Sequence, residues 1–260
     1  MSNGLTSFSL DFFNLKGKVA IVTGGNRGLG QAYAVALAKA GADLFVVSRS
    51  EDWQETKELI EETGRRAVFF QADLSDRHKV KQVAAECQKV YGRIDILVNN
   101  AGTIRRAPIT EYREQDWDDV MEVNINSVYL LSQETAKVMV EQKSGKIINI
   151  ASMLSFQGGK FVPPYTASKH AVAGLTKAFA NELAEYNIQI NAIAPGYIAT
   201  DNTAPIRSDE KRNAEILSRI PAARWGETAD LMGAVVFLAS DASNYMNGHI
   251  LAIDGGWLAR

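Results

Sequence analysis

The chain has 260 residues, of which 46% are hydrophobic and 22% charged, and its formal net charge at pH 7 is -2. These values are typical of a globular protein with a sizeable core, and they give no support for nucleic acid or an anionic membrane as a main partner. Cys87 is the single cysteine and the three histidines lack metal-ligand spacing, so we expect no disulfide framework and no metal site. No apolar run is long enough to span a bilayer, and the sequence predicts a cytoplasmic protein.

The first part of the chain alternates short β-branched runs with helical runs. Residues 1–16 are expected to form an N-terminal arm on the body, and residues 17–260 a single catalytic domain. Ser75 is the expected cap of the third helix. This β-α-β-α rhythm predicts an α/β fold, with one doubly wound parallel sheet of the Rossmann type and helices on both faces. Strands are predicted at residues 18–23, 43–48, 67–71 and 94–99, with helices starting near residue 32 and spanning residues 53–62 and 76–91.

A glycine-rich turn follows the first strand directly and precedes a helix. Its glycines, Gly24, Gly28 and Gly30, are spaced G-x-x-x-G-x-G. Glycines let the backbone approach a pyrophosphate, and the helix N-terminus supplies free N–H groups, although a tight turn uses glycine for steric reasons alone. In parallel sheets, ligands bind beyond the carboxyl ends of the strands. Four residues of this sequence fall there: Gly24, Asp73, Asn100 and Gly102.

The later part of the chain continues the pattern. Asn124 falls inside a long predicted helix, where asparagine is unfavourable. It is either an exposed position or a kink that frees a carbonyl for a chain of waters. Residues 201–226 are the least regular portion, interpreted as a substrate lid or a helical insertion. The long helix is predicted at residues 117–140, a last helix at 228–239, and strands at 146–151, 188–193 and 249–253.

Tyr165 and Lys169 lie four residues apart at the start of a predicted helix that follows two prolines. On a helix, the phenol and the ammonium share one face, and the fixed charge lowers the pKa of the phenol toward the working pH. Such a tyrosine can take a proton from an alcohol or give one to a carbonyl. Ser152, just after the fifth strand, would polarise the reacting oxygen. The tyrosine–lysine spacing is common, so its weight depends on the rest of the chain.

The ordered set of motifs resembles the short-chain dehydrogenase/reductase family, from about residue 16 to the C-terminus. The motifs are Thr23-Gly-Gly-Asn-Arg-Gly-Leu-Gly30, Asn99-Asn-Ala-Gly102, Asn124, Ser152, Tyr165-x-x-x-Lys169 and Pro195-Gly196. The resemblance implies a nicotinamide cofactor, a homotetramer, and Tyr165 as the general acid/base. It further implies that Lys169 holds the nicotinamide ribose and lowers the pKa of Tyr165, and that Asn124 anchors a proton-relay water. The implied cofactor contacts are Gly24, Asn26, Arg27, Gly28, Leu29, Gly30, Ser48, Arg49, Asp73, Leu74, Asn100, Ala101, Gly102, Tyr165, Lys169, Pro195, Gly196, Ile198 and Thr200.

A closer resemblance is to the 2-keto-3-deoxygluconate 5-dehydrogenase group of this family, also named 2-deoxy-D-gluconate 3-dehydrogenase. It rests on residues 104–106, 150–159, 194–197, 220–226 and 254–260. It implies interconversion of 2-keto-3-deoxy-D-gluconate and its 2,5-diketo form during uronate breakdown, and a subunit contact at Trp257 and Arg260. Guanidinium groups suit a carboxylate, with a surface or interface salt bridge as the alternative. The candidate substrate residues are Arg105, Arg106, Ser152, Gln157, Lys160 and Tyr165.

The phosphate state of the cofactor stays open in the sequence. No carboxylate ends the second strand, and Arg49 with Arg27 would suit the 2′-phosphate of NADP, whereas the group resemblance favours NAD. Alternative functions within the family are a gluconate 5-dehydrogenase and a 3-oxoacyl-thioester reductase. Outside it, the alternative is a non-catalytic dinucleotide-binding regulator, which would not need Tyr165.

Overall fold

The computed structural model describes residues 9–259, and its centre is one parallel sheet of seven strands in the order β3-β2-β1-β4-β5-β6-β7. β1 pairs in parallel with both β2 and β4, so the direction of winding reverses between these two neighbours. The predicted doubly wound parallel sheet is confirmed. The strands are β1 (Val19–Thr23), β2 (Asp43–Ser48), β3 (Ala67–Gln71), β4 (Ile96–Asn99), β5 (Gly145–Ile150), β6 (Ile188–Pro195) and β7 (Ile250–Ile253).

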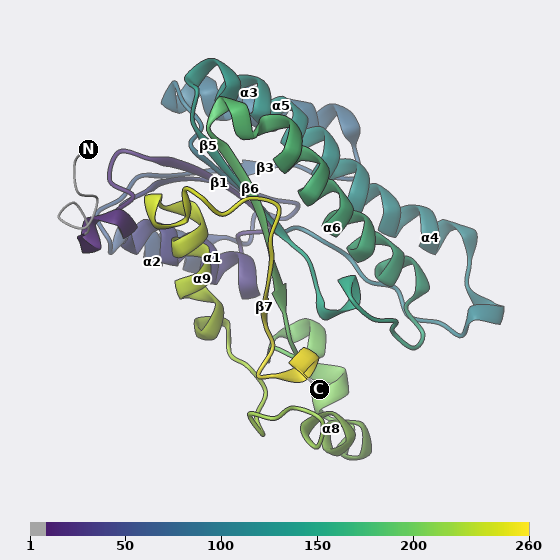
Figure 1. Cartoon of the computed structure of the whole chain (residues 1–260). Helices are drawn as coiled ribbons and strands as arrows, with labels where there is room; N and C mark the ends of the chain where they lie inside the picture. The colour runs from purple at the N-terminus through teal and green to yellow at the C-terminus, as the bar shows by residue number, and fades with distance from the viewer. Residues whose placement is uncertain (1–8, 260) are drawn as a thin grey trace.

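Helices cover both faces of the sheet, with α1, α2 and α9 on one side and α3, α5 and α6 on the other (Figure 1). Alternate residues of β1 serve the two layers. Ala20 and Val22 pack with α1 and α9, while Val19 and Ile21 pack with α3 and α5. Because both faces are buried, the strands read as continuous apolar runs. The helices are α1 (Gly28–Lys39), α2 (Gln54–Glu61), α3 (Arg77–Tyr91), α4 (Glu114–Met121), α5 (Ser127–Gln142), α6 (Pro163–Leu183), α7 (Ala204–Arg207), α8 (Glu210–Leu217) and α9 (Met232–Ala239).

The long helix predicted around Asn124 is interrupted by a π-helical turn over Glu122–Asn126, between α4 and α5. The Ser127 N–H bonds to the Glu122 carbonyl, five residues back, and the Ser127 hydroxyl donates to the Val123 carbonyl at 2.6 Å. In a regular α-helix, the Ser127 N–H would take the Val123 carbonyl. The hydroxyl therefore replaces the bond that the π turn removes. Asn124 is only 1% exposed, so the exposed alternative for this residue was wrong.

The predicted cap of α3 differs from the structure. Asp76, and not Ser75, caps this helix: the Asp76 carboxylate accepts the His78 N–H at 2.8 Å. The Ser75 hydroxyl is instead bonded to the Asp73 carboxylate at 2.8 Å.

The described part of the arm is a 3-10 turn, Leu10–Phe13, followed by the buried Leu15. Phe13 lies against Phe237, with ring centres 6.5 Å apart, but Leu10 is 80% exposed and does not pack as expected. Phe8 lies outside the described residues.

Residues 201–226 contain helical stretches, as the helical-insertion alternative expects: α7, α8 and a 3-10 turn. Ile216 and Ile220 are buried in a small cluster with Met153 and Trp257, which ties this segment to the loop after β5. Figure 1 shows α8 beyond the ends of β6 and β7, beside the C-terminus. Within residues 9–259, no helix combines the length and apolarity that crossing a membrane requires.

Candidate active site

Hydrogen bonds join the ends of β1 and β4 where the sheet reverses. The Thr23 hydroxyl oxygen accepts the N–H groups of Asn100 and Ala101, both at 3.0 Å. The Asn100 side-chain amide donates to the carbonyls of Thr23 at 2.9 Å and Gly24 at 3.3 Å. Doubly wound sheets bind ligands in the crevice at this switch point. The structure thus brings the glycine loop and the Asn-Ala-Gly segment together.

The glycine loop encloses a space, called the glycine cradle below, that side chains at its glycine positions would fill. A Cβ on Gly30 would overlap the Gly24 carbonyl oxygen, and Gly24 and Gly28 have φ of +64° and +57°, where L side chains are strained. α1 starts at Gly28, and the Arg27 side chain at its N-cap makes no capping bond. The first N–H groups of the helix are therefore available to an anion. These residues fit the pyrophosphate of a dinucleotide.

β2 ends at Ser48 without a carboxylate, and Arg49 follows it directly. Ser48 is buried, and its hydroxyl donates to the Ser50 carbonyl at 2.7 Å. The guanidinium groups of Arg27 and Arg49 are exposed, and neither is paired with a carboxylate in the described chain. A backbone hydrogen bond from Ser75 lowers the pKa of Asp73, and the Arg49 charge adds to this effect.

The remaining predicted cofactor residues also follow the carboxyl ends of strands. Pro195 ends β6, the Gly196 N–H bonds to the Ile253 carbonyl at 2.9 Å, and a Cβ on Gly196 would lie 2.5 Å from the Asp254 Cα. After β1 come Asn26 and Leu29, after β3 the buried Leu74, after β4 Ala101 and Gly102, and after β6 the buried Ile198 and the turn residue Thr200.

The first turns of α6 hold Tyr165 and Lys169 against the end of β5. The Lys169 ammonium donates to the Ile150 carbonyl at 2.6 Å and lies 5.5 Å from the centre of the Tyr165 ring. The Ser155 hydroxyl donates to the Lys169 carbonyl at 2.7 Å, which fixes the loop after β5 to the helix. The Ser152 side chain lies close enough to the Tyr165 phenol to lower its pKa. The structure thus unites the serine, the tyrosine and the lysine.

The protonation of this pair differs from the prediction. Burial raises the pKa of Tyr165, and the Ser152 side chain and the charge of Arg106 offset only part of the rise. Burial also lowers the pKa of Lys169 to about 8, although its ammonium donates a hydrogen bond to the Ile150 carbonyl. The expected lowering of the phenol pKa by Lys169 is not seen. At neutral pH the phenol is protonated and able to donate.

Asn124 links the loop after β4 to the tyrosine helix. Its side-chain amide donates to the Thr103 carbonyl at 2.9 Å and to the Ser168 hydroxyl at 3.1 Å. Its carbonyl oxygen accepts the Thr103 N–H at 2.8 Å. Ser168 in turn donates to the Tyr165 backbone carbonyl at 2.7 Å. The asparagine side chain therefore sets the distance between the loop and the start of α6.

Arg105 is bound to acidic residues of α4. Its guanidinium lies 3.3 Å from a carboxylate oxygen of Asp119 and 3.5 Å from one of Asp116. It also donates to the Thr103 hydroxyl at 2.9 Å. The salt-bridge alternative is the one observed for this residue.

Arg106 is the free member of the pair. It is exposed, its guanidinium has no ion-pair partner among residues 9–259, and its charge lowers the pKa of Tyr165. The neighbouring Ala107 N–H bonds to the Phe161 carbonyl at 3.1 Å, which holds this segment against the start of α6. Sequence reasoning named both arginines and had no signal that separated them.

Gln157 and Lys160 lie on the loop before α6. Gln157 accepts the Trp257 indole N–H at 3.2 Å, and the Lys160 ammonium lies 4.9 Å from the centre of the Phe161 ring. Trp257 is 5% exposed, and the Arg219 guanidinium stacks 4.0 Å from its ring centre. The tryptophan is thus packed within its own chain, unlike the subunit contact expected of it. Arg260 lies outside the described residues.

No group of residues suited to hold a metal ion occurs in the part of the chain that the structure describes. Cys87 is buried, and burial raises its thiol pKa to about 12, so it is inert as a nucleophile.

Residues 18–211 match the family described as short chain dehydrogenase. The chain belongs to this family and is an oxidoreductase. It is 57% identical, over 96% of its length and 98% of the relative, to the 2-dehydro-3-deoxy-D-gluconate 5-dehydrogenase of Bacillus subtilis (strain 168). The enzyme of the same name from Escherichia coli (strain K12) is 55% identical, over 96% and 99%. A crystal structure from Agrobacterium tumefaciens, described as a candidate 2-deoxy-D-gluconate 3-dehydrogenase with bound NADP, is 50% identical. It matches with a TM-score of 0.89 over 95% and 99% of the two chains.

Proposed function

We propose that this oxidoreductase interconverts a hydroxyl and a keto group of a sugar acid with NADP(H). The proposed substrate pair is 2-keto-3-deoxy-D-gluconate and 2,5-diketo-3-deoxygluconate. The observation that carries the proposal is the grouping of Ser152, Tyr165 and Lys169 at the end of β5, at the same edge of the sheet as the glycine cradle. The sugar-acid names of both relatives support the substrate class.

The chain's own residues supply the proton chemistry. In the reducing direction, the Tyr165 phenol gives its proton to the oxygen that becomes the alcohol, and the Ser152 hydroxyl donates a hydrogen bond to the same oxygen. In the oxidising direction, the phenol oxygen takes the proton back. Lys169 holds the nicotinamide ribose, and Asn124 anchors the proton-relay water. When bound, the nicotinamide supplies or accepts the hydride.

The substrate carboxylate is assigned to Arg106. Arg105 is already paired with Asp116 and Asp119, whereas Arg106 is unpaired and its charge acts on the Tyr165 phenol. A guanidinium can hold a carboxylate by two parallel hydrogen bonds. Gln157 and Lys160, on the loop that joins Ser152 to α6, are proposed to contact the sugar hydroxyls, and residues 201–226 to close over the substrate.

NADP is proposed over NAD because β2 ends without a carboxylate and the Arg27 and Arg49 guanidinium groups have no described ion-pair partner. A 2′-phosphate would give them one. The NADP bound in the Agrobacterium tumefaciens structure supports this choice.

A substrate panel with both cofactors tests the proposal. We expect NADPH-dependent reduction of 2,5-diketo-3-deoxygluconate with a kcat/KM at least about tenfold above that for 5-ketogluconate or an acetoacetyl thioester. Preference for the ketogluconate or the thioester would replace the substrate with the corresponding alternative. Tight NADP binding without turnover of any compound would indicate the non-catalytic regulator.

A further inference from the structure

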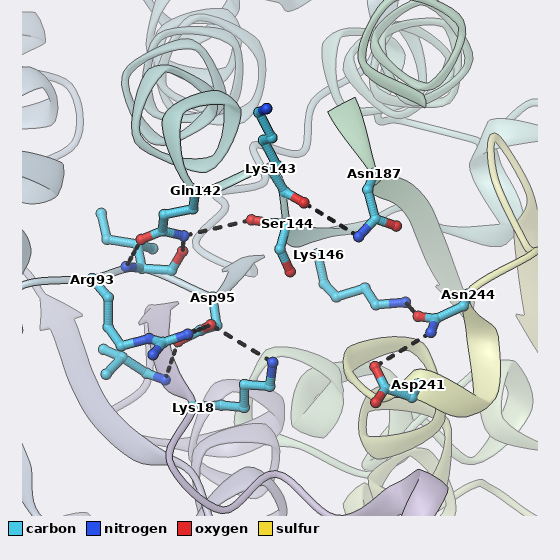
Figure 2. Close-up of polar contacts among 12 residues, drawn as sticks. Lys18, Arg93, Asp95, Gln142, Lys143, Ser144, Lys146, Asn187, Asp241 and Asn244 are labelled. Atoms are coloured by element: carbon cyan, nitrogen blue, oxygen red, sulfur yellow. Dashed lines mark hydrogen bonds and ion pairs between the residues drawn. The ribbon is translucent and has the colours of Figure 1, made fainter. Parts of the chain in front are cut away.

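A cavity of about 40 Å³ lies at the edge of the sheet opposite Tyr165. The amino ends of β4, β5 and β6 form one wall, and the segments before β1 and after α9 complete it. Figure 2 shows polar side chains from these elements directed toward one another. The charged residues that line the cavity are Lys18, Asp95, Lys146 and Asp241. The glycine loop and the proposed catalytic residues follow the carboxyl ends of the strands, so the cavity is separate from the candidate active site.

Lys146 is a buried cation without a counter-ion. It is 7% exposed, and its ammonium donates to the Asn244 side-chain oxygen at 2.7 Å and to the Ser243 hydroxyl at 3.4 Å. It forms no ion pair with any residue in the described range. A buried ammonium that lacks a negative partner is costly, and burial lowers the pKa of Lys146 to about 8.

Lys18 brings a second ammonium to the cavity. It lies 3.9 Å from a carboxylate oxygen of Asp95, but Arg93 already binds that carboxylate through hydrogen bonds of 2.8 and 2.6 Å. The charge of Lys18 acts on Lys146, because it lowers the pKa of that residue. Asp241 is exposed and raises the same pKa without forming an ion pair. The charges of Arg93 and Asp95 neutralise each other. The ammonium groups of Lys18 and Lys146 are then left with a single carboxylate, that of Asp241.

The rest of the polar lining is neutral. Asn14, Ser144, Asn187 and Gln189 contribute amide and hydroxyl groups, of which the Asn187 and Gln189 amides each already donate one hydrogen bond within the protein. We propose that this cavity binds a compact oxyanion, a carboxylate or a phosphate group, between Lys146 and Lys18. The anion would supply the negative charge that Lys146 lacks, and charge-assisted hydrogen bonds are the strong ones. This site lies apart from the glycine cradle, so it can be occupied together with the cofactor.

Titration calorimetry of the intact protein with inorganic phosphate, and separately with acetate, tests the site. Saturating NADP⁺ keeps the glycine loop occupied, and sodium chloride matches the ionic strength. We expect saturable binding of one anion per chain. Lys146→Met removes the charge, and Asn244→Asp, at an exposed position, places a carboxylate against Lys146. Both should weaken binding at least about tenfold. Lys143→Met is the matched control, since its side chain points away from the cavity in Figure 2.

Phosphate binding that depends on Lys146 identifies a phosphate site, and acetate binding with this dependence a carboxylate site. Either supports the proposal. Three results would overturn it: no saturable binding of either anion, binding that survives both cavity variants, or an equal loss in Lys143→Met.

Discussion

At the scale of single residues, burial governs the reacting groups. Tyr165 is kept protonated by burial, while the Lys169 ammonium is directed at the Ile150 carbonyl. The Arg106 guanidinium, which has no ion-pair partner among residues 9–259, lowers the pKa of the phenol. The resting site is therefore prepared to donate a proton to a keto oxygen.

The raised pKa of Tyr165 predicts different pH responses in the two directions. Reduction needs the phenol, so its kcat/KM should stay within about twofold between pH 6 and 7.5. Oxidation needs the phenolate, so its kcat/KM should rise about tenfold per pH unit until the phenol titrates. Steady-state rates in both directions provide the check. An oxidation rate that is already constant below pH 7 would mean that the pKa is lowered.

The Arg49 guanidinium makes a prediction for the cofactor. Arg49→Ala should lower kcat/KM with NADPH by about 10- to 100-fold, because a charge-assisted contact to the 2′-phosphate is lost. With NADH the change should be less than about threefold, since there is no phosphate to contact. Rates with the two cofactors on the same preparation give the ratio. A wild-type enzyme that strongly prefers NADH would disprove the contact.

The residue types of the site were readable in the sequence, because glycine turns, a tyrosine–lysine pair and a strand-end serine follow from local spacing. The sequence did not show that Arg105 forms ion pairs and Arg106 does not, because this depends on where Asp116 and Asp119 of α4 lie. The state of Lys169 was also hidden, because the Ile150 carbonyl that binds it comes from a strand 19 residues away.

At the scale of elements, the π turn between α4 and α5 is the feature that places Asn124. The turn directs the Asn124 side chain to the Thr103 backbone and to Ser168, and so connects the loop after β4 to α6. The Ser127 hydroxyl stabilises the turn by donating a hydrogen bond to the Val123 carbonyl. Helical periodicity by itself does not locate the turn, since one inserted residue leaves the apolar pattern on either side intact; the unfavourable Asn124 was the signal for a kink.

Removal of the Ser127 hydroxyl should loosen this turn. Ser127→Ala is expected to cost about 1 kcal/mol of unfolding free energy and to lower kcat about tenfold, with the Kd for NADP⁺ within about twofold. Chemical denaturation, steady-state kinetics and cofactor titration measure the three quantities. Ser127→Thr keeps the hydroxyl and is the matched control. If the alanine variant turned over at the wild-type rate, the π turn would not position the site.

The strands were predicted closely because each is an apolar run ending at polar or glycine residues, and β2 and β3 agree in both bounds. The segment 201–226 was predicted to be the least regular portion because its helical stretches are short and mostly polar. They are held by Ile216 and Ile220, whose partners Met153 and Trp257 are far away in sequence.

At the scale of the whole molecule, α4, α5 and the loop before α6 each carry a large apolar side chain in solvent. Trp117 is 42% exposed, Tyr129 41% and Phe161 48%. Large apolar groups exposed to solvent are suited to an interaction surface. The homotetramer implied by the sequence resemblance would cover such a surface.

Light scattering after size-exclusion chromatography should therefore give the mass of four 28.4 kDa chains. Tyr129→Glu should shift the protein to smaller species, because a charge buried in an interface is costly. Lys137→Glu, on the same helix at an exposed ion pair, is the control and should remain tetrameric. A monomer at micromolar concentration would contradict the prediction.

The central claim is that the Tyr165 phenol is the acid/base of a sugar-acid oxidoreductase. Turnover of 2,5-diketo-3-deoxygluconate by Tyr165→Phe, measured beside NADP⁺ binding, tests it most directly. The substitution removes the hydroxyl and keeps the ring. We predict a loss in kcat of about 10²- to 10⁴-fold, with cofactor affinity within about threefold of the wild type. Wild-type turnover by the phenylalanine variant would contradict the claim.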